Sequence, residues 1–280
     1  MIEDVEYSMP VNIIVAHGLE AKALVRMLKL ERDQASTEFV EYSNPNKLRL
    51  LVSGIGKEAV AAAVTYLGEQ QACDDGEIRA WLNIGIAGHR DAPLGSAWLG
   101  NKITEHSSGD SAYPPQLIEG FGVGRVVTVD EPENSYPLNA AYEMEASAFY
   151  AEATKYSTAE LVQVFKVISD NLENPISEID IHSVPGLIAA QAPQLLTLIE
   201  RMSAIVEQYN SSQRLPSFYS EICARTHLTV NQKLQLRRLC QRYKALGLEE
   251  DLGSIANLKA SNARQLIQQL AERIDRISEA

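Results

Sequence analysis

The stretch that decides the fold runs from Glu143 to Asp170 and reads EMEASAFYAEATKYSTAELVQVFKVISD. Its small residues predict a helix over 146–155, and the apolar, β-branched run that follows predicts a buried strand over 161–168. The strand ends at Ser169 and Asp170. A carboxylate at the end of a buried strand is costly unless a partner or ligand uses it, and ligands in open α/β sheets bind at the carboxyl ends of strands. Asp170 therefore lies where a functional residue is expected.

The segments before and after this stretch alternate between predicted strands and predicted helices. Strands that alternate with helices are typical of an α/β fold, so we expect a mostly parallel central sheet flanked by helices on both faces. Apolar runs predict strands at 11–17, 81–84, 97–103 and 125–129, a turn-rich cluster predicts a hairpin of 39–42 with 48–52, and amphipathic runs predict helices at 20–30, 57–70 and 183–209.

A polar segment divides the chain. Residues 210–217 read NSSQRLPS, and such a polar segment with a proline is typical of a linker. All of the predicted strands lie in residues 1–209, whereas residues 218–280 are predicted to form helices only. The sequence therefore predicts an α/β catalytic domain, a linker and a small helical accessory module.

The charge of the chain is uneven. The net charge is −12, whereas residues 211–280 carry 11 Lys and Arg against 7 Asp and Glu, so the first 210 residues hold a balance of −16. An acidic domain is a poor binder of nucleic acid. In the module, Thr229 is expected to cap a helix over 230–246 that has a basic side. That side is either a solvated face or a docking surface for an acidic partner, a nucleic acid or the acidic domain itself.

Composition argues against several other classes of protein. No segment is long and apolar enough to span a membrane, and the N-terminal sequence MIEDVEYSMP lacks the apolar core of a signal peptide. The cysteines Cys73, Cys223 and Cys240 are far apart and odd in number, as expected of reduced thiols in a cytoplasmic protein. The five histidines show no paired ligand spacing, so we expect no metal site and no cofactor.

Five short motifs resemble those of one enzyme superfamily. They are Ala16-His17-Gly18-Leu19-Glu20, Ser53-Gly54-Ile55-Gly56-Lys57, Asn83-Ile84-Gly85-Ile86-Ala87-Gly88, Glu143-Met144-Glu145 and Ser169-Asp170. In this order they are similar to turns of the purine nucleoside phosphorylase / uridine phosphorylase superfamily, and most similar to those of 5'-methylthioadenosine/S-adenosylhomocysteine nucleosidases. The resemblance covers roughly residues 11–209, and it implies a purine nucleoside substrate and a homodimer or larger homo-oligomer.

The resemblance also implies a role for each carboxylate. Asp170 would protonate the leaving purine as a general acid, and Ser169 would hold its orientation. Glu145 would accept hydrogen bonds from the ribose hydroxyls, and its charge would favour the cationic sugar of the transition state. Glu20 would take a proton from the attacking water. The other residues expected to bind the substrate are Met144, which would pack under the ribose, and Ala87, Gly88 and Glu143.

Each motif also has a plain structural interpretation. Glu20 suits the first turn of a helix, Glu143 and Glu145 suit a solvated turn, and Asp170 suits the cap of a loop. Glycines are common in ordinary connections between strands and helices, so a single Gly-x-Gly is a weak signal. The order in which all five motifs occur favours the functional interpretation.

The nucleophile is a separate choice between water and phosphate. A phosphate nucleophile needs cationic donors, and the first turn of this chain holds Glu20, whose charge would repel phosphate. Water is therefore favoured, which predicts a nucleosidase. Lys166 and Arg90 are the two cations that would bind the anion in the alternative, a phosphate-dependent phosphorylase.

The section between Ile103 and Ala141 is much shorter than in typical members of the superfamily. In them it supplies an aromatic residue that stacks on the purine, and Phe121, Tyr136 and Tyr142 are the candidates here. The short section leaves the nucleoside and its 5'-substituent open. It also leaves a third possibility beside the two enzymes, namely a nucleoside-binding or assembly protein with reduced catalysis that uses the helical module for interaction.

Overall fold

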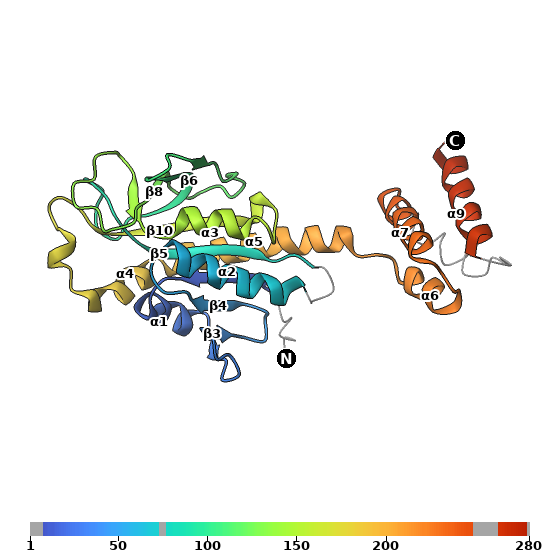
Figure 1. Cartoon of the computed structure of the whole chain (residues 1–280), viewed down its shortest axis with the longest axis horizontal. Helices are drawn as coiled ribbons and strands as arrows, with labels where there is room; N and C mark the ends of the chain where they lie inside the picture. The colour runs from blue at the N-terminus through green and yellow to red at the C-terminus, as the bar shows by residue number, and fades with distance from the viewer. Residues whose placement is uncertain (1–7, 73–76, 249–262, 279–280) are drawn as a thin grey trace. The chain divides into compact units, whose positions relative to one another are not determined.

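The computed structural model divides the chain into two units, residues 1–208 and 209–280 (Figure 1). It describes residues 8–72, 77–248 and 263–278. The first unit is an α/β unit and the second is helical. Within the described residues, no helix has the length and apolar character needed to cross a membrane.

The first unit is built on one sheet, in which the described residues form ten strands. They are β1 (Val11–Val15), β2 (Glu31–Arg32), β3 (Val40–Ser43), β4 (Arg49–Val52), β5 (Ala80–Gly88), β6 (Ala97–Glu105), β7 (Ser111–Ala112), β8 (Val123–Thr128), β9 (Ala141–Glu143) and β10 (Val162–Asp170). The strands follow the order β10-β6-β8-β9-β5-β1-β4-β3-β2, with β7 paired to β6. Because β10 also pairs with β5, the strands β10, β6, β8, β9 and β5 close into a ring.

The long pairings in the centre of the sheet are parallel. β5 runs parallel to both β1 and β10, and β8 runs parallel to β6 and β9. The pairing of β6 with β10 and the β3–β4 hairpin are antiparallel, which makes the sheet mixed. The predicted α/β fold is therefore confirmed, and its antiparallel share is larger than expected because β6 joins the ring by a non-local pairing.

Helices cover both faces of the sheet. One face packs against α1 (Gly18–Met27), α4 (Val184–Ala190) and α5 (Ala192–Gln213), and the other packs against α2 (Lys57–Ala72) and α3 (Ala146–Ala153). Neighbouring residues of a strand point to opposite faces. In β1, Ile13 accordingly packs in the cluster that contains Leu24 of α1, and Ile14 packs in the cluster that contains Val64 of α2. The described part of the unit also contains three short 3₁₀ turns, at Ala159–Leu161, Ile176–Glu178 and Ile181–Ser183.

Two expectations about the end of the first unit are corrected. The single helix expected over 183–209 is broken at Gln191, because Pro193 has no amide hydrogen and its ring clashes with the preceding turn. The linker expected over 210–217 is helical in its first four residues, since α5 runs on to Gln213 and only residues 214–216 lie outside a helix. Asn, Ser and Gln cost little in a helix, whereas the proline at position 216 disfavours a helical residue before it.

The second unit consists of helices in its described residues. These are α6 (Ser217–Arg225), α7 (Val230–Ala245) and α9 (Ala263–Ser278). Thr229 caps α7 as predicted, because its hydroxyl accepts from the amide of Gln232 and the Gln232 side chain accepts from the amide of Thr229. Tyr243 is buried at the centre of the unit, and its hydroxyl donates to the carbonyl of Leu270 at 3.1 Å.

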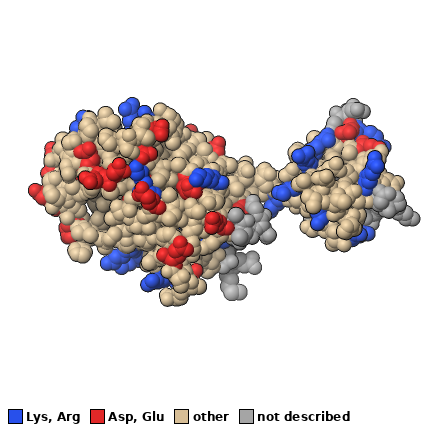
Figure 2. Space-filling view, viewed as in Figure 1, with Lys and Arg blue, Asp and Glu red and all other residues tan. Residues whose placement is uncertain are grey.

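The surface charge of the two units differs in the view of Figure 2. Asp and Glu side chains gather on the first unit, and Lys and Arg side chains prevail on the second. On α7, Lys233, Arg237 and Arg238 are exposed. Arg242, in contrast, lies 3.3 Å from Asp275 of α9, and Lys244 donates to the backbone carbonyls of residues 211 and 214. Two of the basic side chains of α7 thus make contacts within the second unit. A docking role for the exposed basic residues stays a prediction.

Candidate active site

A cavity of about 420 Å³ lies at the carboxyl ends of β1, β5 and β10. Five carboxylates line it, from four separate parts of the chain, and they belong to Glu20, Glu133, Glu143, Glu145 and Asp170. The structure brings together in this cavity all of the residues that the sequence predicts as catalytic or substrate-binding, namely Glu20, Ala87, Gly88, Glu143, Met144, Glu145, Ser169 and Asp170. Lys166 and Arg90 do not line it.

Glu20 is held by backbone amides on both of its carboxylate oxygens. Oε2 accepts from the amides of Ala16 and His17, at 2.9 Å and 3.0 Å, and Oε1 accepts from the amide of Ile86 at 3.0 Å. The contact with the amide of His17 belongs to a capping box at the start of α1, so the plain structural interpretation of Glu20 is also correct. Its carboxylate nevertheless faces the cavity from a fixed position, which is what a base that activates a nucleophile requires.

The approach of Glu20 to β5 depends on Gly85. A Cβ atom at this position would lie 2.9 Å from Oε1 of Glu20 and 3.2 Å from Nζ of Lys166. The first separation is too short for a Cβ atom, and the second is tighter than most Cβ contacts. Gly85 therefore lets the carboxylate of Glu20 and the ammonium group of Lys166 both approach the backbone of β5.

Glu143 joins α3 to the sheet. Its Oε2 accepts from the amide of Glu145 at 3.0 Å, and both of its oxygens accept from the amide of Ala146, the first residue of α3. Thr128 at the end of β8 donates to Oε1 at 2.6 Å. Glu143 is therefore a buried cap of the helix, and the alternative of a solvated turn is wrong for both Glu143 and Glu145.

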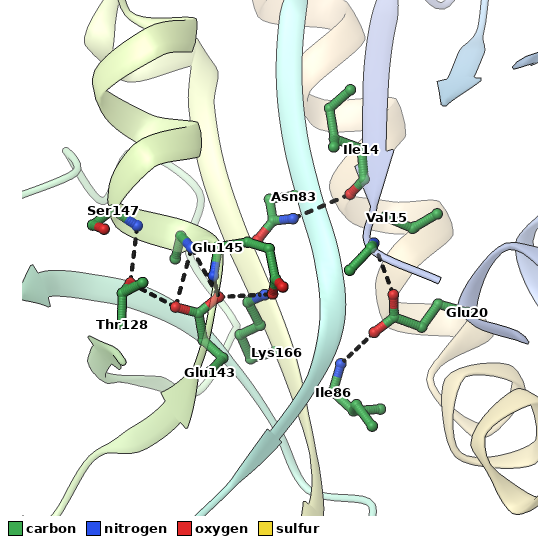
Figure 3. A network of polar contacts seen from close by, with 12 residues as sticks. Ile14, Val15, Glu20, Asn83, Ile86, Thr128, Glu143, Glu145, Ser147 and Lys166 are labelled. Carbon is green, nitrogen blue, oxygen red and sulfur yellow. Dashed lines mark hydrogen bonds and ion pairs between the residues drawn. The ribbon is translucent and has the colours of Figure 1, made fainter. Parts of the chain in front are cut away.

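Lys166 lies beside Glu143 and Glu145 (Figure 3). Only 1% of its side chain is exposed. Its Nζ is 2.8 Å from Oε2 of Glu143 and 4.0 Å from Oε2 of Glu145. Burial lowers the pKa of Lys166, but the charges of Glu143 and Glu145 outweigh that effect and raise the pKa above its usual range. The residue is a buried cation that is already paired.

Burial also changes the pKa values of two carboxylates in the cavity, those of Glu145 and Glu20. Burial raises the pKa of Glu145 to about 7, against the opposing charge of Lys166 and with a further rise from Glu143. One Glu145 oxygen accepts from the amide of Gly56 at 2.9 Å. Burial also raises the pKa of Glu20, and Lys166 and the three backbone amides only partly offset it. The five carboxylates of the cavity outnumber the ammonium group of Lys166, which suits the cavity to a positively charged species.

Asp170 is held by two hydroxyl groups. The Ser169 hydroxyl donates to Oδ1 at 2.5 Å, and the Tyr136 hydroxyl donates to Oδ2. The orienting contact from Ser169 was expected from the resemblance. The contact from Tyr136 was not, because Tyr136 stands 34 residues away in a segment with no helix or strand. The one signal in the sequence was an aromatic residue within the shortened section.

Solved structures of nucleosidases resemble the chain. A 5'-methylthioadenosine/S-adenosylhomocysteine nucleosidase from Colwellia psychrerythraea, in complex with adenine, matches with a TM-score of 0.53 and 21% identity over 70% of this chain and 96% of its own. The 5'-methylthioadenosine nucleosidase of Arabidopsis thaliana matches with 0.57 and 16% over 69% and 96%. Futalosine hydrolase of Helicobacter pylori matches with 0.56 and 14% over 68% and 97%. The chain has the nucleosidase fold.

Comparisons of the sequence with protein families and with curated proteins give no match. The motifs that carry the predicted resemblance are short and lie in turns, and at 14–21% identity the likeness is one of fold. Within the nucleosidase fold, the match spans nearly the whole length of each solved structure.

The three aromatic candidates for base stacking occupy different places in the nucleosidase fold. Tyr142 lines the cavity, and its hydroxyl accepts from the amide of Leu138 at 2.9 Å. Tyr136 is buried beside it, with ring centroids 5.8 Å apart, and its hydroxyl is used by Asp170. Phe121 lies outside the cavity, with the guanidinium of Arg201 5.9 Å from its ring centre. Tyr142 is therefore the one candidate of the three that can meet a ligand.

Proposed function

We propose that this chain hydrolyses the N-glycosidic bond of a purine nucleoside and releases the free base. One observation carries the proposal: Glu20, Glu145 and Asp170 line the same cavity, although they come from α1, the start of α3 and the end of β10. A site built from three convergent carboxylates matches a reaction in which the sugar becomes positively charged. The nucleosidase fold adds support at the level of architecture.

Asp170 is the proposed general acid. Cleavage of the glycosidic bond leaves the bonding electrons on the purine, which is a poor leaving group until a proton reaches its N7. The carboxyl group lies at the wall of the cavity beside the backbone of Ala87 and Gly88, and it is oriented by the hydroxyls of Ser169 and Tyr136. One well-placed general acid contributes about 10²- to 10⁴-fold to a rate.

Glu145 and Glu20 act on the other side of the bond. Glu145 would accept hydrogen bonds from the ribose hydroxyls and stabilise the cationic sugar, with Met144 packed beneath the ring. Glu20 would remove a proton from the attacking water as the water adds to the sugar carbon. Its raised pKa brings it closer to the pH of the reaction, which makes a carboxylate a better base.

Water is favoured over phosphate as the nucleophile because neither candidate cation is available to an anion in the cavity. Lys166 is paired with Glu143 at 2.8 Å, and Arg90 does not line the cavity. A phosphorylase would also place a multiply charged anion among five carboxylates. The phosphate-dependent reaction is therefore the weaker alternative, and no cofactor has a part in the proposed reaction.

The substrate we propose is a nucleoside like 5'-methylthioadenosine or S-adenosylhomocysteine. Most of the cavity lining is apolar, with Leu19, Ile55, Ile176, Ile179, Ile181 and Val184 among its residues. An apolar wall suits a thioether or another uncharged 5'-substituent better than a phosphate. A homo-oligomer in the cytoplasm is part of the same proposal, and the free thiols of Cys223 and Cys240 agree with a reducing compartment.

The test is release of the free base, measured by chromatography, from 5'-methylthioadenosine, S-adenosylhomocysteine, adenosine and inosine, with and without phosphate. We expect adenine from the first two substrates at a rate that phosphate does not change. Release that depends on phosphate would assign the chain to the phosphorylases. Binding of adenine without release from any nucleoside would favour the third possibility, a nucleoside-binding or assembly protein.

A further inference from the structure

Tyr136 contacts the proposed general acid from outside the cavity. Its side chain is 1% exposed, and its hydroxyl donates to Oδ2 of Asp170. Since the hydroxyl of Ser169 donates to Oδ1, each oxygen of the carboxyl group has its own donor. Two donors on two oxygens fix the plane of the carboxyl group as well as its position.

The backbone of Tyr136 shows that its position is imposed by its surroundings. Its φ of +41° lies in the left-handed region, which a bulky aromatic residue rarely adopts. Such a conformation persists where neighbouring contacts determine it, and it is found preferentially at functional sites. The segment around Tyr136 has no helix or strand, so these contacts come from outside regular secondary structure.

Two contacts hold this segment in place. The ring nitrogen Nε2 of buried His89 lies 2.9 Å from Oδ1 of Asn139, and the amide of Leu138 donates to the Tyr142 hydroxyl. The backbone amides of Asp91 and Ala92 donate to Nδ1 of His89, so the proton is on Nε2 and His89 donates to Asn139. His89, directly after β5, thus fixes the segment that carries Tyr136 through its contact with Asn139.

Gly88 makes room for the contact. A Cβ atom at this position would lie 2.5 Å from the Tyr136 ring and would also overlap Oδ2 of Asp170. Gly88 lines the cavity, whereas Tyr136 does not. Tyr136 therefore reaches the carboxylate from the side away from the substrate and leaves the cavity side of Asp170 open.

We propose that Tyr136 is a positioning residue of the nucleosidase reaction, which fixes the carboxyl group of Asp170 in the orientation that delivers a proton to the purine. The inference rests on the proposed function. Tyr136 acts through Asp170 and does not touch the substrate. Its loss therefore reduces the chemical step and leaves substrate binding nearly intact.

The test is the variant Tyr136→Phe in the full chain, which keeps the ring and removes the hydroxyl. If the free energy of a hydrogen bond to a charged group is lost in the transition state, kcat should fall by about 10-fold to 100-fold. We expect KM for 5'-methylthioadenosine to stay within about twofold. The matched control is Tyr150→Phe, which removes a hydroxyl from another buried tyrosine, on α3, and should leave kcat unchanged. A Tyr136→Phe variant with unchanged kcat would overturn the proposal.

A second measurement separates positioning from a general loss of structure. In the Asp170→Asn background, Tyr136→Phe should cause no further loss of the residual kcat, because the group it positions is already disabled. The same fold-loss in both backgrounds would mean that Tyr136 acts independently of Asp170, which contradicts the proposal.

Four proteins, namely the unsubstituted chain, Tyr136→Phe, Asp170→Asn and the double variant, distinguish a failure of this inference from a failure of the proposed function. If the unsubstituted chain releases no base, the nucleosidase proposal fails, and the catalytic role of Tyr136 fails with it. Their unfolding free energies still test the contact, since Tyr136→Phe and Asp170→Asn should then be non-additive. Additive values would refute the contact itself.

Discussion

The ammonium group of Lys166 lies 2.8 Å from Oε2 of Glu143, and each of the two side chains is 1% exposed. Glu143 lines the cavity and accepts from the amides at the start of α3, whereas Lys166 lies behind it, outside the cavity lining. A buried ion pair of this kind adds little stability compared with an apolar pair. Removal of one partner, however, leaves the other charge buried and uncompensated. The pair therefore has a measurable consequence for stability.

The variant Lys166→Met should destabilise the protein by about 3–5 kcal/mol, because it leaves Glu143 and Glu145 buried without a cation. The measurement is urea unfolding at pH 7. The matched control is Lys155→Met, which breaks the 2.5 Å surface pair between Lys155, just after α3, and Glu152 of α3. Since Lys155 is 62% exposed, its loss should cost less than about 1 kcal/mol. Equal costs for the two variants would contradict the structural role given to Lys166.

Stability should fall as the pH rises from about 5 to 7. Burial raises the pKa of Glu145 from 4.5 to about 7, so the folded protein binds a proton that the unfolded chain has already released in this window. The folded state then binds more protons than the unfolded state, which makes the slope of unfolding free energy against pH negative. Glu145→Gln should flatten that slope by up to about 1.4 kcal/mol per pH unit, measured by urea unfolding at pH 5, 6 and 7. Glu20, whose pKa is also raised, should keep part of the slope. An identical slope in the variant would show that Glu145 titrates normally.

The strands and the residues at their ends could be predicted from the sequence because both are local properties. The apolar run that ends at Asp170 and the turn that ends at Gly88 each follow from a short window, and parallel strands bring their carboxyl ends to one edge of a sheet. Glu20, in contrast, was assigned to the site by the resemblance of its turn to that of the nucleosidases. These predictions concern where a residue lies along its own element.

The contacts between distant segments could not be predicted in this way. Lys166 was considered as a ligand of an anion, but the fold pairs it with Glu143, which stands 23 residues earlier in the sequence. Tyr136 reaches Asp170 through a segment without periodicity, and β6 closes the ring of strands by pairing with β10 across the chain. Such choices depend on packing and on the charges that burial brings together, and neither can be obtained from a local pattern.

Replacement of Gly88 by alanine should disrupt the site. The added Cβ would lie 2.5 Å from the Tyr136 ring and against the carboxylate of Asp170, and these groups are packed too tightly to move freely. We expect a loss of about 1–3 kcal/mol in unfolding free energy together with a marked loss of base release. The control is Gly186→Ala in α4, where no atom lies within 4 Å of the added carbon and alanine favours the helix. A Gly88→Ala variant as stable and active as the control would contradict the close approach.

The variant Asp170→Asn should abolish most of the base release without unfolding the protein. Asparagine has nearly the same shape, and the hydroxyls of Ser169 and Tyr136 can each donate or accept, so their contacts survive in part. Loss of a general acid predicts a fall in kcat of about 10²- to 10⁴-fold, with binding of adenine retained in calorimetry. Unchanged turnover would remove Asp170 from the role of the acid.

Deletion of residues 218–280 should leave a folded and active first unit. The two hydrophobic clusters that cover the faces of the sheet draw all of their buried residues from positions 11–206, and a separate cluster, between Phe218 and Ile274, serves the helical unit. The cavity is likewise lined by residues between Ala16 and Val184. The truncated chain should therefore unfold in one cooperative step in urea, with a smaller m-value than the full chain because less surface is exposed, and should release base within about twofold of the full rate. A truncated chain that aggregates or unfolds without cooperativity would mean that the helical unit completes the fold of the first, and a folded but inactive chain would assign the module a part in catalysis.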